Sequence, residues 1–138
     1  MKKFWILVIV LAAIACKEEN ATPDKPIDDD FDPTGATISK SGLFVNSAHT
    51  VTGTATLYED AGKKTVLLDP FMSDNGPDLK VYLSKDANAT EYINLGVMKS
   101  TSGKQSYEIP GNPDISGYKY VLIWCQQFSV LFGKAELK

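Results

Sequence analysis

Few side chains in this sequence have the chemistry of a nucleophile, a base or a soft metal ligand. The chain contains two cysteines, Cys16 and Cys125, and one histidine, His49. A covalent c-type haem needs a C-x-x-C-H run, and a structural zinc usually takes about four Cys or His ligands, so neither site can be assembled. A blue-copper site normally uses a pair of histidines, a cysteine and a weak axial methionine. His49 and Cys125 with Met72 or Met98 would form an incomplete set, so we predict no cofactor, keep copper or haem as alternatives, and expect both methionines to fill the core.

The N-terminus has the organisation of a secretory signal that ends at Cys16. Lys2 and Lys3 precede an apolar run over residues 4–15, which is too short to span a bilayer. The small residues directly before Cys16 resemble the processing box of bacterial lipoproteins, where the chain is cut before the cysteine and a diacylglycerol is attached to its sulfur. We therefore predict a signal peptide over residues 1–15 and lipidation of Cys16, which anchors the protein to a membrane without spanning it.

The residues after Cys16 indicate which membrane carries the anchor. Lys17, Glu18 and Glu19 follow directly, and a cysteine followed by lysine and two acidic residues resembles a surface-export signal of lipoproteins in some Gram-negative bacteria. We therefore expect lipid anchoring in the outer membrane with the domain exposed at the cell surface. The periplasmic face is the alternative.

Cys125 has two interpretations. If Cys16 carries lipid, Cys125 is the only thiol left, and a leftover cysteine in a secreted protein indicates intermolecular pairing or a free reactive group. That interpretation gives Cys125 a redox role, with His49 as its candidate acid–base partner. The other interpretation is a small apolar side chain in a central strand, because unpaired cysteines are among the most buried residues. Two-residue alternation places Cys125 on one strand face with Val121 and Ile123.

Other kinds of chemistry have less support. No G-x-S-x-G elbow and no phosphate-binding glycine loop occurs. Asp69, Asp74 and Asp78 lie around the Asn75-Gly76 turn, where backbone capping explains them more simply than catalysis or calcium binding. All 14 basic residues are lysines and the net charge is −3, so a nucleic-acid partner is not expected. An accessory redox role is favoured over enzymatic catalysis.

The composition divides the chain after the signal into a spacer and one domain. Residues 17–37 hold seven acidic residues, two lysines and three prolines, and almost no apolar residue. Such a segment cannot bury enough surface to offset the entropy of ordering it. We predict that residues 16–37 carry the lipid and form a disordered acidic tether, and that residues 38–138 form a single domain.

Within residues 38–138 the apolar period is two, which indicates strands. In His49 to Glu59, Val51, Ala55 and Leu57 alternate with threonines. Glycine and proline separate the runs, and no convincing helical segment occurs. We predict an all-β fold, a single antiparallel β-sandwich or partly closed barrel of about eight strands. The expected strands include residues 49–59, 65–68, 79–84, 93–98, 105–109, 118–126 and 130–137, with 118–128 in a central position because it is apolar on both faces.

The motifs of this region resemble, in their order and spacing, the DM-thirteen (DM13) domain, a small extracellular module often labelled an electron-transfer domain. They are Gly42-Leu43-Phe44, His49 to Ala55, Leu68 to Phe71, Asn75 to Leu79, Val81-Tyr82-Leu83, Leu95-Gly96, Gln105 to Pro110 and Val121 to Gly133. The resemblance implies that Cys125 is the family's characteristic cysteine, on which a redox role with a partner protein has been proposed. The alternative function is a non-catalytic binding or adhesion module held at the cell surface.

Overall fold

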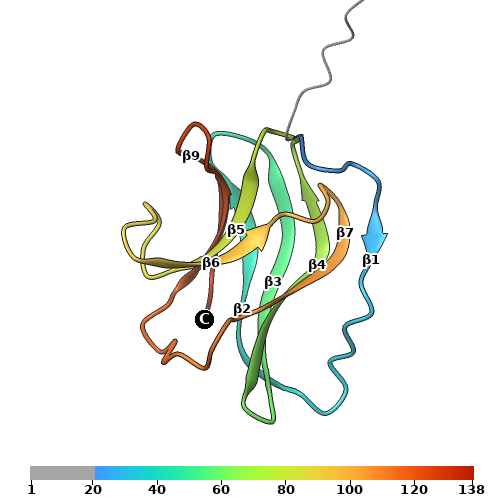
Figure 1. Cartoon of the computed structure of the whole chain (residues 1–138), viewed down its shortest axis with the longest axis vertical. Coiled ribbons are helices and arrows are strands. Elements are labelled where there is room, and N and C mark those ends of the chain that lie inside the picture. The colour runs from blue at the N-terminus through green and yellow to red at the C-terminus, as the bar shows by residue number, and fades with distance from the viewer. Residues whose placement is uncertain (1–20) are drawn as a thin grey trace, which may run out of the picture.

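A computed structural model describes residues 21–138, so the predicted signal peptide and Cys16 lie outside the described residues. The described part consists of strands and turns without a helix (Figure 1), and it therefore holds no helix that could cross a bilayer. The nine strands are β1 (Ile27–Asp28), β2 (Thr37–Asn46), β3 (Val51–Asp60), β4 (Lys63–Ser73), β5 (Leu79–Ser84), β6 (Tyr92–Val97), β7 (Gly103–Glu108), β8 (Tyr120–Cys125) and β9 (Val130–Glu136). The predicted all-β fold is confirmed.

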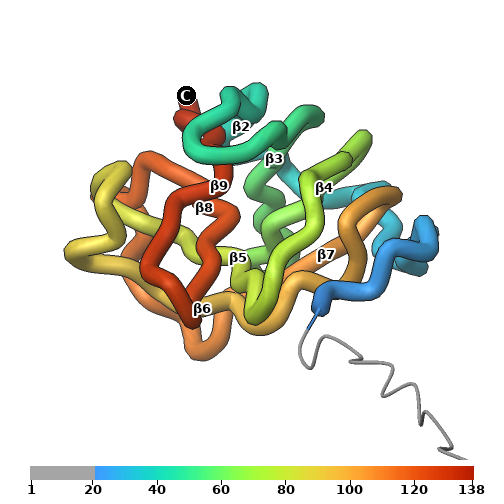
Figure 2. Tube along the Cα trace, turned by 90° about the horizontal axis from the view of Figure 1, so that it is seen from above, coloured from blue at the N-terminus to red at the C-terminus, as the bar shows by residue number. Residues whose placement is uncertain are grey.

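All nine strands belong to one curled sheet with the order β1-β7-β4-β3-β2-β9-β8-β5-β6. Figure 2 shows that it curls into two walls, with β3, β4 and β7 in one and β9, β8, β5 and β6 in the other. Only β1 is parallel to its neighbour. The central position predicted for β8 is confirmed, because it pairs with both β5 and β9.

Strand β2 forms the corner between the two walls. It pairs with β3 through residues 37–43 and with β9 through residues 44–46. Gly42 lies at the change of partner, where a Cβ atom would come 2.1 Å from the Glu136 carbonyl oxygen. Glycine allows this close approach of two backbones, and so the sheet can bend sharply here.

The core lies between the walls and follows the alternation expected from the sequence. Val51, Ala55 and Leu57 of β3 are buried, while its threonines lie on the other face. Val121, Ile123 and Cys125 of β8 face the same core. Met98 is fully buried as expected, but Met72 is 62% exposed. The expectation for Met72 is wrong because the preceding Phe71 takes the inward position of β4 and alternation turns Met72 outward.

The segment expected to be a disordered tether is folded against the sheet over its described part. We call residues 21–36 the N-terminal strap. Within it, β1 pairs with Gly103 and Lys104 of β7, and the amide of Asp29 donates to the Lys104 carbonyl at 3.0 Å. Gly103 has φ of +101° and would place a Cβ 2.0 Å from the Ile27 carbonyl oxygen, so glycine is required for this approach. The strap supplies backbone hydrogen-bond partners to β7, which would otherwise have an unpaired edge. The acidic composition of the strap does not predict this pairing.

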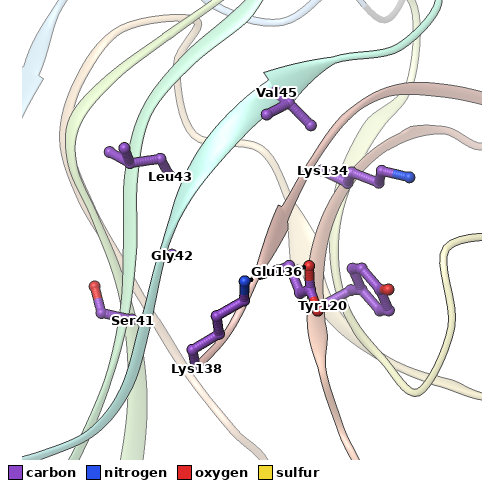
Figure 3. A pocket seen from close by; sticks show the side chains of 8 residues that line it. All are labelled: Ser41, Gly42, Leu43, Val45, Tyr120, Lys134, Glu136 and Lys138. Carbon is purple, nitrogen blue, oxygen red and sulfur yellow. Dashed lines mark ion pairs between the residues drawn. The ribbon is translucent and has the colours of Figure 1, made fainter.

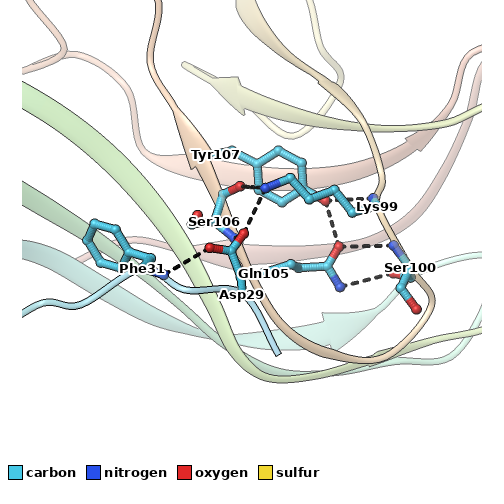
Figure 4. A network of polar contacts seen from close by, with 7 residues as sticks. All are labelled: Asp29, Phe31, Lys99, Ser100, Gln105, Ser106 and Tyr107. Carbon is cyan, nitrogen blue, oxygen red and sulfur yellow. Dashed lines mark hydrogen bonds and ion pairs between the residues drawn. The ribbon is translucent and has the colours of Figure 1, made fainter. Parts of the chain in front are cut away.

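Asp29 fixes the strap through a network of polar contacts with β7 and the preceding loop (Figure 4). Its carboxylate accepts from Lys99 Nζ at 2.8 Å, from the Ser106 amide at 3.2 Å and from the Phe31 amide at 3.0 Å. Burial alone would raise the pKa of Asp29, but the Lys99 ammonium and the backbone amides outweigh it and hold the pKa well below its usual range. One carboxylate of the acidic run is therefore a structural group.

A buried amide continues this network beneath the strap. Gln105 is fully buried; its Oε1 accepts from the Tyr107 hydroxyl at 2.6 Å, and its Nε2 donates to the Ser100 carbonyl at 3.0 Å. The Ser100 hydroxyl in turn donates to the Lys25 carbonyl in the strap at 2.7 Å. Burial raises the pKa of Tyr107, so its hydroxyl stays protonated as a donor.

Candidate functional site

Cys125 ends β8 and lies at the edge of the core. Its side chain is buried, with the residue only 1% exposed, and it faces inward with Val121 and Ile123 as the alternation predicts. The thiol Sγ donates a hydrogen bond to the Pro77 carbonyl oxygen at 3.1 Å. The sulfur therefore has a polar neighbour and is not enclosed by hydrocarbon alone.

His49 lies in the turn between β2 and β3 and is partly exposed. Its ring stacks on Phe132, with the ring centroids 3.9 Å apart. Its Nδ1 lies 3.6 Å from Asp74 Oδ2, and the same carboxylate oxygen accepts from the Thr50 amide at 3.0 Å. The aromatic contact fixes the plane of the imidazole, and the Asp74 carboxylate lies beside its Nδ1.

Both predicted site residues line one pocket of about 290 Å³ at one end of the curled sheet. The turns β2–β3 and β4–β5 and the loop β8–β9 form this pocket. Its lining residues are His49, Asn75, Gly76, Pro77, Cys125, Phe128, Val130 and Phe132. Gly76 is close to Phe132, because a Cβ there would lie 2.5 Å from the ring. The lining is mainly apolar, with one thiol and one imidazole as its reactive groups.

The other candidate residues lie outside this pocket or have structural partners. Neither Met72 nor Met98 lines the pocket. Asp74 accepts from the Thr50 amide, and Asp78 pairs with Lys80 Nζ at 2.8 Å. Within residues 21–138, no group of three His, Cys, Asp or Glu side chains is arranged to hold a metal ion. His49 and Cys125 are thus the soft donors that this pocket could offer to a metal.

A second pocket, of about 350 Å³, lies along the corner strand β2 (Figure 3). Its lining residues are Ser41, Gly42, Leu43, Val45, Tyr120, Lys134, Glu136 and Lys138. It contains ammonium groups and a carboxylate, but neither a thiol nor an imidazole. The pocket with Cys125 and His49 is therefore the better candidate for redox chemistry.

Sequence reasoning missed the aromatic side chains and the carbonyl that complete the site. Phe128 and Phe132 belong to motifs noted in the sequence, but their roles follow from the way the β8–β9 hairpin folds over the β4–β5 turn. The Pro77 carbonyl is a backbone group, and no side-chain pattern reports it. The signal that was available was the cluster of turn residues at Asn75 to Pro77.

The fold and the pocket define a small all-β module with a buried thiol and an imidazole in the lining of one pocket. The model of the family described as Electron transfer DM13 matches residues 43–137. This match covers more than half of the chain, and the chain therefore belongs to the electron transfer DM13 family, as its motifs suggested. No curated protein and no solved structure matches it.

Proposed function

We propose that this protein is a lipid-anchored envelope protein whose DM13 domain takes part in electron transfer through Cys125. The observation that carries the proposal is the shared pocket, in which the fold brings Cys125 and His49 together from distant parts of the sequence. The family relation supports an electron-transfer role. The partner is a protein or small molecule that carries a disulfide.

The proposed step is thiol–disulfide exchange. His49 accepts the proton of the Cys125 thiol, and the thiolate attacks one sulfur of the partner's disulfide. The new bond joins Cys125 to that sulfur while the partner's own S–S bond breaks. The leaving thiolate then takes the proton from His49. Cys125 is oxidised from a thiol to a mixed disulfide, and the other partner sulfur is reduced to a thiol.

Three features of the pocket bear on this step. The Cys125 thiol donates to the Pro77 carbonyl, so this hydrogen bond has to break when His49 takes the proton. Asp74 Oδ2 lies 3.6 Å from His49 Nδ1, so the Asp74 carboxylate can help to orient the imidazole ring. Phe128 and Phe132 line the pocket and give it a mainly apolar wall, against which an apolar part of the partner can pack.

The test uses folded full-length protein and an aromatic disulfide that releases a coloured thiolate. We expect folded protein to release one equivalent of thiolate by reaction at Cys125, and Cys125→Ser to release none from this site. His49→Gln should slow the reaction of the folded protein by at least about tenfold. The rate after denaturation, which should be equal in wild type and His49→Gln, controls for intrinsic thiol reactivity. A Cys125 thiol that stays silent until the protein is denatured would refute the redox role and favour the binding module.

Two further measurements test the anchor and the cofactor. Mass spectrometry of the mature N-terminus should find a diacylglycerol on Cys16, and Cys16→Ser should leave the membrane fraction. An unmodified Cys16 in the mature protein refutes anchoring. The absorption spectrum of protein from its native host should show aromatic bands alone, whereas a visible band would indicate copper or haem and refute a thiol acting without a cofactor.

A further inference from the structure

The N-terminal strap brings the start of the described chain to the pocket end of the domain. Ala21 forms a bridge with Pro77. The Thr22 amide donates to Asn75 Oδ1 at 3.1 Å, and Asn75 Nδ2 donates back to the Thr22 carbonyl at 2.8 Å. The pocket lining includes both Asn75 and Pro77. Figure 1 shows the described chain beginning at the end where the β2–β3 and β8–β9 connections lie.

This attachment shortens the distance between the domain and a lipid on Cys16. Residues 16 and 21 are five positions apart, a distance of at most about 18 Å when the chain is fully extended. A free spacer from Cys16 to residue 37 would instead reach roughly 70 Å. Because the strap is fastened to the sheet, only the first of these lengths is available. The pocket end therefore has to stay close to the membrane surface.

The surface of this end has the composition of a membrane-contacting surface. Phe128 in the β8–β9 loop is 63% exposed, and Met72, next to the strap at the end of β4, is 62% exposed. Met72 forms a bridge with Ser102 in the loop that accommodates the strap. The three connections at this end (residues 47–50, 74–78 and 126–129) contain only His49, Asp74 and Asp78 as titratable residues, and the start of the strap adds Asp24 and Lys25. Contact with lipid headgroups would desolvate few charges and would bury two apolar side chains.

We infer that this end of the domain docks on the membrane that carries the Cys16 lipid, with Phe128 and Met72 inserted at the headgroup level. The inference rests on the lipid anchor of the proposed function. The occupant of this end is the lipid surface, because the short chain to Cys16 keeps the local concentration of lipid headgroups high there. The pocket with Cys125 and His49 then opens toward the membrane, so its redox partner has to be associated with that membrane.

Hydroxyl-radical footprinting on vesicles tests this orientation. The lipidated full-length protein is reconstituted in phosphatidylethanolamine–phosphatidylglycerol vesicles and compared with a variant that has about fifteen Gly and Ser residues inserted between Asn20 and Ala21, enough for roughly 20 Å of added reach. We expect oxidation of Phe128 and Met72 to be several-fold lower with the native spacing. Ile38 at the start of β2 and Tyr92 at the start of β6 are also exposed but lie at the end of the domain away from the pocket, and they should react equally in both proteins.

Two outcomes overturn the inference. Equal oxidation of Phe128 and Met72 in both proteins shows that this end stays in water. Reduced oxidation at both ends shows that copies of the chain associate, or that another surface is covered. Flotation with the vesicles and the mass of the N-terminus are measured first. A protein that fails to float because Cys16 lacks lipid refutes the proposed anchor, whereas a protein that floats without protection of Phe128 refutes the docking alone.

Discussion

The contacts of Asp29 in the N-terminal strap should contribute measurably to the free energy of unfolding. Replacing Asp29 with Asn keeps the shape of the side chain but removes its charge, and it turns an amide group toward donors at Lys99 or Ser106. The carboxylate is only 19% exposed and lies 2.8 Å from Lys99 Nζ. Hydrogen bonds to a buried charged group contribute about 1.5–3 kcal/mol, but Lys99 is itself half-exposed and water screens the ion pair. We expect Asp29→Asn to lower the free energy of unfolding by about 1–2 kcal/mol.

The assay is urea unfolding of both proteins as a function of pH, with Asp30→Asn as the matched control. Asp30 is an exposed neighbour, so its replacement makes the same change in net charge without the network. The folded state lowers the pKa of Asp29, so its stabilisation is complete above the ordinary carboxyl pKa of about 3.9 and is lost as the pH falls below it. The difference between wild type and Asp29→Asn should be largest near neutrality and shrink in acid. An equal effect of Asp29→Asn and Asp30→Asn at neutral pH would refute the reasoning.

Three further substitutions or titrations follow from the fold. Gly103→Ala should detach the strap and lower stability by about 2–4 kcal/mol in urea unfolding, because a Cβ there collides with a strap carbonyl at positive φ; an unchanged midpoint would contradict this. Gln105→Ala should cost about 2–3 kcal/mol, since it leaves polar groups of Ser100 and Tyr107 buried without partners, and thermal unfolding measures it. Burial beside a neighbouring tyrosine raises the pKa of Tyr82 to about 12. In ultraviolet titrations, the curves of wild type and Tyr82→Phe should therefore coincide at lower pH and differ by one phenolate only near pH 12.

The sequence predicted the strands with a strong apolar pattern and missed those defined by their partners. In β3 apolar residues alternate with threonines, and β8 is an apolar run in which two-residue spacing gave the inward direction of Cys125. The expected strand at residues 65–68 is part of β4, which continues to Ser73 through Asp69 and Pro70. Its partner β3 shifts register at Gly53 and Ala55, and this bulge accommodates the proline within the sheet. Such an accommodation depends on the pairing of two strands, and the sequence of either strand alone does not reveal it.

The site was predictable to a smaller extent than the fold. Residue types selected Cys125 and His49, because few other side chains could take part in redox or metal chemistry. Their placement in one pocket depends on the hydrogen bonds between turns, such as the Asp74 amide donating to the Thr50 carbonyl at 2.9 Å. These contacts join segments that are separated by more than twenty residues. Local patterns carry no information about such closures.

Residues 21–36 were expected to be disordered from their composition, but they are folded against the sheet. Net negative charge disfavours order when the charges remain in water, and most of these carboxylates do. Order requires only enough fixed contacts to offset the entropy of the segment, and here one carboxylate, one short parallel pairing and the Thr22–Asn75 contacts supply them. Because these contacts extend along the side of the sheet and end at the pocket, the same residues that order the strap also determine where a lipid on Cys16 would hold the domain. The strength of the strap and the orientation of the pocket are therefore coupled, and a variant such as Gly103→Ala that loosens the strap should also release Phe128 from the membrane in the footprinting experiment.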